Sequence, residues 1–160
     1  MKFRIGQGFD VHALVKNRDL ILAGVSIPWE KGLEGHSDAD VVIHAVIDAL
    51  LGAAGLGDIG EHFSDADPKW KNCNSRDMLK TIDNLISADH WIIENLDISL
   101  LLEAPKISQY KMKMKENLAE DLKISLSKIN LKATTTEKLG FLGRSEGIAC
   151  LAVCLLSRKE

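Results

Sequence analysis

Aromatic residues, prolines and cysteines are all scarce in this chain. Of its 160 residues, 5% are aromatic, three are proline and three are cysteine. An odd, small number of cysteines without the paired spacing of a zinc ribbon argues against a disulfide-stapled secreted domain. No secretory signal is visible either, so these features predict a reducing, cytoplasmic location.

An excess of positive charge is also missing. The chain has 20 Lys and Arg against 23 Asp and Glu, a formal net charge of −3. The chain therefore lacks the excess of basic residues that is typical of nucleic-acid-binding proteins. It also shows no basic amphipathic helix of the kind that binds a membrane surface. The longest apolar runs, such as residues 149–156, are too short to cross a bilayer. We therefore expect neither a nucleic-acid partner nor a membrane.

Glycine is absent from the middle of the chain. Nine of the 12 glycines lie within residues 1–60, and the other three stand at positions 140, 143 and 147. Because glycine permits unusual backbone angles and close approach, we expect the functional site at these two ends. The chain has no repeat, linker or low-complexity segment, so we expect one domain over residues 1–160.

The apolar pattern alternates between strand and helix. It predicts strands over residues 3–12, 96–102, 129–134 and 147–156, a two-strand unit over 20–27, and helices over 38–54, 75–88 and 109–122. Ser37 with Asp40, and Ser75, are expected helix caps. The strand 147–156 is apolar throughout, which predicts burial on both faces. This order indicates an α/β (α+β) layered sandwich with one mixed sheet and helices on one face.

Three polar residues interrupt the otherwise apolar helix 38–54. Asp40, His44 and Asp48 recur every four residues, which places them on one stripe of the helix. Burial of these groups without partners would cost several kcal/mol, so the stripe must face a metal, a polar ligand or water. A solvated polar face is the alternative.

A second polar pair lies in the first strand. Asp10 and His12 are two residues apart, so both side chains point to the same face of a strand. With His44 they form a set of two imidazoles and one carboxylate, and three such ligands with an open fourth position describe a catalytic zinc site. Taken alone, such a pair is more typical of a loop cap or a surface pair than of a metal site.

Three short segments could bind phosphate. Residues 35–38 stand where the helix is expected to begin, and free N–H groups there favour anions at His36 and Ser37. The alternative is that Ser37 only caps the helix. Residues 133–138 close one expected strand and residues 103–106 follow another, at positions where ligands often bind. A threonine run is also typical of a strand edge.

Several long motifs in order are similar to those of the 2-C-methyl-D-erythritol 2,4-cyclodiphosphate synthase family. They are RIGQGFDVHAL at residues 4–14, GHSDADVVIHAVIDALLGAAGLGDIG at 35–60, APK at 104–106 and KATTTEKLGFLGRSEGIA at 132–149. The resemblance implies a compact homotrimer whose active sites lie between subunits. It also implies a reaction of the non-mevalonate isoprenoid pathway, catalysed by a phosphorus–oxygen lyase. The substrate, 4-diphosphocytidyl-2-C-methyl-D-erythritol 2-phosphate, cyclises to 2-C-methyl-D-erythritol 2,4-cyclodiphosphate with loss of CMP.

The resemblance also implies roles for individual residues. Asp10, His12 and His44 are the expected zinc ligands, one zinc per subunit, and Glu137 the ligand of a Mg²⁺ or Mn²⁺ ion on the substrate diphosphate. His36 and Thr135 are the expected stabilisers of the transition state. Substrate contacts are expected at Asp10, His12, Ser37, Asp58, Ile59, Gly60, His62, Phe63, Ser64, Asp65, Asp67, Ala104, Pro105, Lys106, Met112, Ala133, Thr134, Thr136, Glu137, Phe141 and Arg144.

Two further expectations concern positions outside this set. Asp48 lies one turn from His44, and its spacing suggests that it orients the imidazole of His44. Phe141, Arg144 and Glu146 match family positions in a central trimer cavity that binds an isoprenoid diphosphate in some members. Salt bridging across the threefold axis is the alternative for these residues.

Two other functions stay open on the sequence. A zinc phosphohydrolase could use the same metal set to deliver hydroxide to a nucleotide diphosphate, although no general base for the water is evident. A non-catalytic trimer that binds isoprenoid diphosphates is the other alternative.

Overall fold

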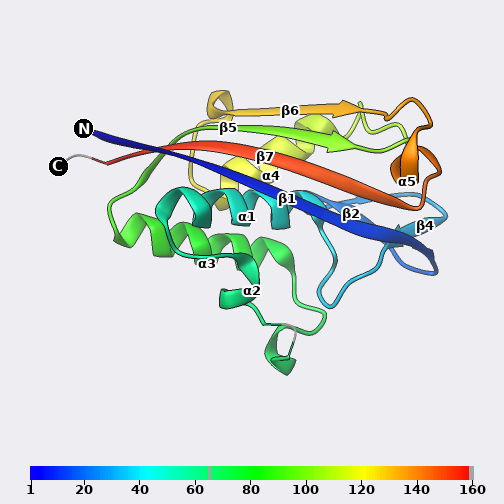
Figure 1. Cartoon of the computed structure of the whole chain (residues 1–160), viewed down its shortest axis with the longest axis horizontal. Helices are drawn as coiled ribbons and strands as arrows, with labels where there is room; N and C mark the ends of the chain where they lie inside the picture. The colour runs from blue at the N-terminus through cyan, green and yellow to red at the C-terminus, as the bar shows by residue number, and fades with distance from the viewer. Residues whose placement is uncertain (65, 159–160) are drawn as a thin grey trace.

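The computed structural model describes residues 1–64 and 66–158, which form one mixed sheet with helices on one face (Figure 1). The strands are β1 (Lys2–Lys16), β2 (Leu20–Leu22), β3 (Val25–Ile27), β4 (Lys31–Leu33), β5 (Ile92–Leu101), β6 (Ile129–Thr134) and β7 (Gly147–Arg158). The α-helices are α1 (Val41–Ala54), α2 (Ile59–His62), α3 (Ser75–Ala88), α4 (Lys111–Asp121) and α5 (Gly140–Gly143), with 3₁₀ turns η1 (Pro68–Trp70) and η2 (Leu126–Lys128).

The main sheet has the order β4-β1-β7-β5-β6. Only β5 and β6 run parallel, and the other neighbours are antiparallel. The short strands β2 and β3 pair with each other, as expected from the sequence. The predicted mixed sheet is therefore confirmed, and β6 has the bounds expected from its pattern.

Helix α1 packs unusually close to β1. A Cβ built on Gly6 would lie 1.9 Å from the carbonyl oxygen of Ala49, and one on Gly8 would lie 1.9 Å from that of Ala45. No side chain fits at either position, so the two glycines let the helix rest directly on the strand. This contact fixes the distance between the two elements that carry the expected metal ligands.

The far face of the sheet is open, and over β1 and β7 it is largely apolar. Side chains of β1 and β7 alternate, and those on the face away from the helices include Phe3, Ile5, Phe9 and Val11 of β1 and Val153 of β7, all exposed. The expectation that β7 is buried on both faces is therefore wrong for the described chain, because Val153 is 43% exposed and no helix covers it. An apolar face of this kind is typical of a surface that another protein chain covers.

The start of α1 differs from the prediction. The helix begins at Val41, and its cap is the buried Asp40 rather than Ser37. The carboxylate of Asp40 accepts hydrogen bonds from the N–H groups of Val42 and Ile43. It also accepts from those of Ala23 and Gly24, at 2.9 and 2.6 Å, in the β2–β3 turn. The two donors in the β2–β3 turn hold the carboxylate of Asp40 in place, so Asp40 rather than Ser37 caps the helix.

We expect Asp40→Ala to lower the free energy of unfolding by about 3 kcal/mol, because a helix cap is lost and buried donors are left unpaired. For a domain of this size that corresponds to a fall of roughly 6–12 °C in Tm, measurable by thermal denaturation followed by circular dichroism. Asp40→Asn keeps the side-chain oxygen that three of the four donors share, so its Tm should fall clearly less than that of Asp40→Ala. A Tm for Asp40→Ala within 2 °C of the parent, roughly half a kcal/mol, would contradict this role.

Candidate metal centre and ligand cavity

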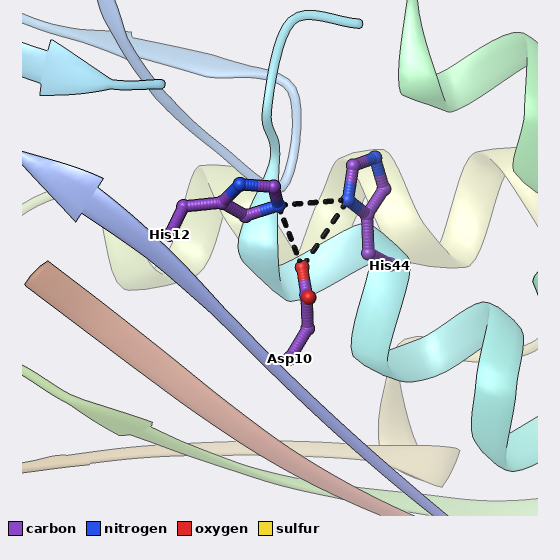
Figure 2. Close-up of side chains that lie close together, drawn as sticks. All are labelled: Asp10, His12 and His44. Carbon is purple, nitrogen blue, oxygen red and sulfur yellow. Dashed lines mark hydrogen bonds and ion pairs between the residues drawn. The ribbon is translucent and has the colours of Figure 1, made fainter. Parts of the chain in front are cut away.

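Three side chains converge on the helix-covered face of the sheet (Figure 2). Asp10 and His12 come from β1, and His44 comes from the first turn of α1. Asp10 Oδ2 lies 2.9 Å from His12 Nε2 and 3.2 Å from His44 Nδ1, and the two nitrogens are 3.2 Å apart. Among the described residues, this is the only cluster of three His, Cys, Asp or Glu donors close enough to share a metal ion.

The proton positions in this cluster favour a cation at its centre. His12 Nδ1 lies 2.7 Å from the carbonyl oxygen of Glu34, which can only accept, so Nδ1 carries the hydrogen. In the neutral ring, His12 Nε2 therefore points a lone pair at the Asp10 carboxylate. Donors 2.0–2.1 Å from a tetrahedral zinc are about 3.3 Å apart, close to the three separations observed. The residues thus fit a zinc ion.

Electrostatics also favour cation binding. Burial opposes ionisation of Asp10, but hydrogen bonds and charge from His12 and His44 outweigh it and hold the pKa of that carboxyl well below its usual range. Burial likewise opposes protonation of His12, yet its hydrogen bond to Asp10 raises the pKa of His12 above its ordinary value. The Asp10 carboxylate therefore carries its negative charge at neutral pH, and that charge draws a cation to the cluster, either a proton on His12 or a metal ion.

A cavity of about 460 Å³ opens onto the three donors. It is lined by Asp10, His12, Gly35, His36, Ser37, His44, Asp48, Ile59, Gly60, Phe63, Ser64, Trp70, Cys73 and Met78. Most of these residues were singled out from the sequence. Trp70, Cys73 and Met78 were not. Trp70 lies in a short 3₁₀ turn, Cys73 in the loop before α3 and Met78 on an amphipathic helix, where the local pattern indicates only packing.

The expected polar stripe on α1 divides into three different roles. His44 faces the metal cluster, but Asp40 is fully buried at the helix start and faces the β2–β3 turn, so that part of the expectation is wrong. Asp48 lines the cavity, where burial raises the pKa of its carboxyl. Its Oδ1 accepts from the N–H of Ile59 at 2.8 Å. Since no hydrogen bond joins Asp48 to His44 among the described residues, Asp48 positions α2 rather than the imidazole.

The anion site expected at the start of α1 is not formed by the helix terminus. The first turn of α1 gives its N–H groups to Asp40, as described above, so they are not available to a phosphate. His36 offers a donor instead. Its Nε2 is the only buried side-chain nitrogen or oxygen among the described residues without a hydrogen-bond partner, and His36 lines the cavity. An unpaired buried imidazole nitrogen is costly unless a ligand satisfies it.

Other expected contacts around residues 58–67 have structural partners. Asp58 caps α2 by accepting from Glu61 N, and Asp67 caps η1 by accepting from Lys69 N. His62 hydrogen-bonds the Leu56 carbonyl at 2.8 Å and lines a second cavity of about 530 Å³, which shares Phe63 with the first. Asp65 lies outside the described residues.

A second group of expected site residues lies across the sheet. Asp10 pairs with Cys150, Cys150 with Leu100, and Leu100 with Ala133, so these four residues form one row over β1, β7, β5 and β6. Three strand spacings separate Asp10 from Ala133 by about 14 Å. The segments 104–112 and 133–137, including Ala104, Pro105, Lys106, Met112 and Thr134, therefore lie at the edge opposite the metal cluster (Figure 1).

Hydrogen bonds and an ion pair connect residues within the second group. Glu103 Oε1 accepts from the backbone N–H of Thr136 at 2.9 Å and so joins the two segments. Thr135 is exposed, and its hydroxyl donates to Glu137 Oε1 at 3.3 Å. The neighbouring Arg144 and Glu146 form an ion pair of 2.7 Å within the chain. Phe141, on α5, is 44% exposed.

Sequence comparison gives a family match over nearly the whole chain. The model of the YgbB family matches residues 3–157. A relative from Enterococcus faecalis, named 2-C-methyl-D-erythritol 2,4-cyclodiphosphate synthase, is 53% identical over 97% of this chain and 99% of its own length. A relative of the same name from Clostridium perfringens is 54% identical over 96% of this chain and 98% of its own length.

Solved structures agree with these matches. The CDP complex of the Plasmodium falciparum protein IspF has a TM-score of 0.86 and 37% identity, and covers 99% of this chain and 97% of that one. The bifunctional IspDF from Campylobacter jejuni has a TM-score of 0.95 and 46% identity over 99% of this chain, which spans 43% of the bifunctional protein. None of the described helices is both long and apolar enough to span a membrane.

Proposed function

This chain belongs to the YgbB family, whose relatives above are 2-C-methyl-D-erythritol 2,4-cyclodiphosphate synthases, and we infer that it catalyses the same cyclisation. It converts 4-diphosphocytidyl-2-C-methyl-D-erythritol 2-phosphate to 2-C-methyl-D-erythritol 2,4-cyclodiphosphate and CMP, in the non-mevalonate pathway. An oxygen of the 2-phosphate bonds to the β-phosphorus, the bond from that phosphorus to the CMP oxygen breaks, and no water is consumed. This chemistry makes the enzyme a phosphorus–oxygen lyase, and we place it in the cytoplasm.

The observation that carries this function is the convergence of Asp10, His12 and His44 at the mouth of a cavity. We propose that the three residues hold one zinc ion. A bound zinc would supply Lewis-acid polarisation of a phosphoryl oxygen and fix the reacting phosphorus in place. The chain's own contribution is a set of one carboxylate and two imidazoles, carried by a strand and a helix that pack in direct contact at Gly6 and Gly8.

His36 is proposed to donate from Nε2 to an oxygen of the diphosphate. Its unpaired, buried nitrogen in the cavity supports this role, since a donor aimed at developing charge stabilises the transition state. Ser37, at the cavity wall, would hold the methylerythritol phosphate. Ile59, Gly60, Phe63 and Ser64 line the same cavity and would surround the sugar-alcohol portion, with Asp58 at their edge.

The remaining contacts would come from a second copy of the chain. In one chain, Thr135 and the segments proposed to bind cytidine lie three strands away from the metal cluster, too far to meet the same diphosphate. The exposed apolar sheet face offers the surface for assembly, and we propose a homotrimer with sites between subunits. Glu137 would then hold a Mg²⁺ or Mn²⁺ ion on the diphosphate of the neighbouring subunit.

Phe141 and Arg144, with Glu146, would line the centre of such a trimer and could contact an isoprenoid diphosphate there. Arg144 is exposed, and its guanidinium pairs with Glu146 within the chain. A diphosphate would therefore compete with Glu146 for that group. Neither a zinc phosphohydrolase nor a non-catalytic isoprenoid binder is supported by the relatives found.

The decisive experiment is product analysis in water enriched in ¹⁸O. The purified protein with zinc and magnesium should release CMP from the substrate in equal amount to the cyclic diphosphate, and neither product should carry ¹⁸O from water. A linear phosphate product that carries ¹⁸O would instead identify a hydrolase and overturn the proposal.

A further inference from the structure

The ring of His44 has a second set of partners on the side away from the metal cluster. Nδ1 faces Asp10 and His12, and the other ring nitrogen points away from them in Figure 2. That nitrogen, Nε2, lies 2.9 Å from the hydroxyl of Ser75. Ser75 in turn donates a short hydrogen bond to Asp38. We propose that Ser75, oriented by Asp38, is the positioning residue that fixes His44 for metal binding.

The direction of the hydrogen bonds follows from the chemistry of the three groups. A serine hydroxyl has one proton, and the proton of Ser75 is given to the Asp38 carboxylate, which only accepts. Ser75 can therefore only accept from His44, so Nε2 carries the hydrogen. In the neutral ring this leaves the lone pair on Nδ1, directed at the cluster. The arrangement selects the one tautomer of His44 that can be a ligand there.

The supporting pair is held in place by the backbone around it. Ser75 is fully buried at the first position of α3, and its N–H donates to the second oxygen of Asp38 at 3.0 Å. Asp38 also accepts from the N–H of Asp40, and its own N–H donates to the carbonyl of Cys73. The loop before α1 and the loop before α3 are thereby joined directly behind His44. Ser37 also lies near Nε2, at 3.2 Å, but it lines the cavity and is more distant.

This inference rests on the metal site proposed above, and zinc affinity tests it without an activity assay. Ser75→Ala removes only the hydroxyl and keeps the backbone bond to Asp38. We expect zinc affinity, measured by competition with a chromophoric chelator, to fall 10- to 100-fold, which is typical when a partner behind a metal ligand is lost. Excess zinc should restore most of the turnover of this variant with little change in KM.

Ser157→Ala is the matched control. Ser157 is also buried, and its hydroxyl also donates to a carboxylate, that of Glu94, but it lies on β7 away from the cluster. Both variants lose a hydrogen bond from a buried serine to a carboxylate, and Ser75→Ala also loses the bond to His44, so the Tm of the metal-free protein should fall in both. Only Ser75→Ala should lose zinc affinity. A merely structural role for Ser75 would not produce that difference.

Two outcomes separate this inference from the proposed function. If the parent protein binds one zinc per chain and Ser75→Ala binds it within twofold of the parent, the positioning role is overturned. If the parent itself binds no zinc, the metal site of the proposed function fails instead. Should Ser75→Ala not fold, Ser75→Cys is slightly larger but keeps the shape of the side chain with a much weaker acceptor, and the same twofold criterion applies to it.

Discussion

His44→Ala is expected to reduce the rate of CMP release by at least about 10³-fold and to leave the purified chain with far less than one zinc per chain. Lewis-acid stabilisation by a bound metal is worth several kcal/mol, and each 1.36 kcal/mol is a factor of ten in rate. Removal of one of three donors leaves the other two unable to complete the site. The measurements are metal analysis by mass spectrometry and a coupled assay for CMP.

The fold should survive this substitution. His44 lies in the first turn of a helix, and alanine favours helix more than histidine does. His90→Asn is the control, because His90 is exposed and has a positive φ of 60° that asparagine tolerates. The control should keep both zinc and activity. A His44→Ala protein with full zinc content would show that the cluster of Figure 2 is not the metal site.

Mixed assemblies of two inactive variants should regain activity if each site draws on two chains. His44→Ala disables the metal side of a site, and Thr135→Ala disables the residue proposed to act on the same diphosphate from the neighbouring chain. In trimers assembled at random from equal amounts, a quarter of the sites would combine an intact metal side with an intact Thr135. We therefore expect the co-expressed mixture to reach about a quarter of the parent rate, although each variant alone is nearly inactive.

The control for this experiment uses two changes on the same side of the site. A mixture of His36→Ala chains and His44→Ala chains should regain no activity. Both residues line the cavity of the same chain, so every site in the mixture lacks one of the two imidazoles. If the His44→Ala and Thr135→Ala mixture also shows no recovery while light scattering shows trimers, the active site does not form between chains as proposed. Light scattering that shows only monomers would contradict the trimer itself.

The metal cluster was predictable because two simple periodicities determine it. Asp10 and His12 share a face of a strand, and His44 interrupts a helix that is otherwise apolar, so each residue has one direction in which to point. The roles of the neighbouring polar residues were not predictable in this way. Ser37 and Ser75 each fit a local capping pattern, but the caps of α1 and α3 are Asp40 and Asn74. The roles that Asp40 and Ser75 take instead depend on partners 16–37 residues away in the chain.

Asp48 illustrates the same limit. Helical spacing correctly places Asp48 near His44, since both line the cavity, but the partner of its carboxylate is the N–H of Ile59 beyond the helix. The pairing of β6 with β5 could be expected from the order of the elements. The separation of about 14 Å between Asp10 and Ala133 could not be predicted, because it depends on how β1, β7, β5 and β6 pair, and no single segment of the sequence determines that register. Local patterns thus place side chains on faces, and tertiary contacts decide what they meet.

The close contact of Gly6 and Gly8 with α1 has a consequence for how this protein tolerates sequence change. Neither glycine touches the cavity, and neither takes part in the chemistry. A methyl group at either position would nevertheless push the helix outward and carry His44 with it, because the helix backbone already occupies that space. Metal ligands must lie within a few tenths of an ångström of their ideal positions, so His44 would then no longer share a metal ion with Asp10 and His12. Gly6 and Gly8 are therefore constrained by the position of His44, although neither lines the site, and a substitution that fills this contact would displace a proposed metal ligand.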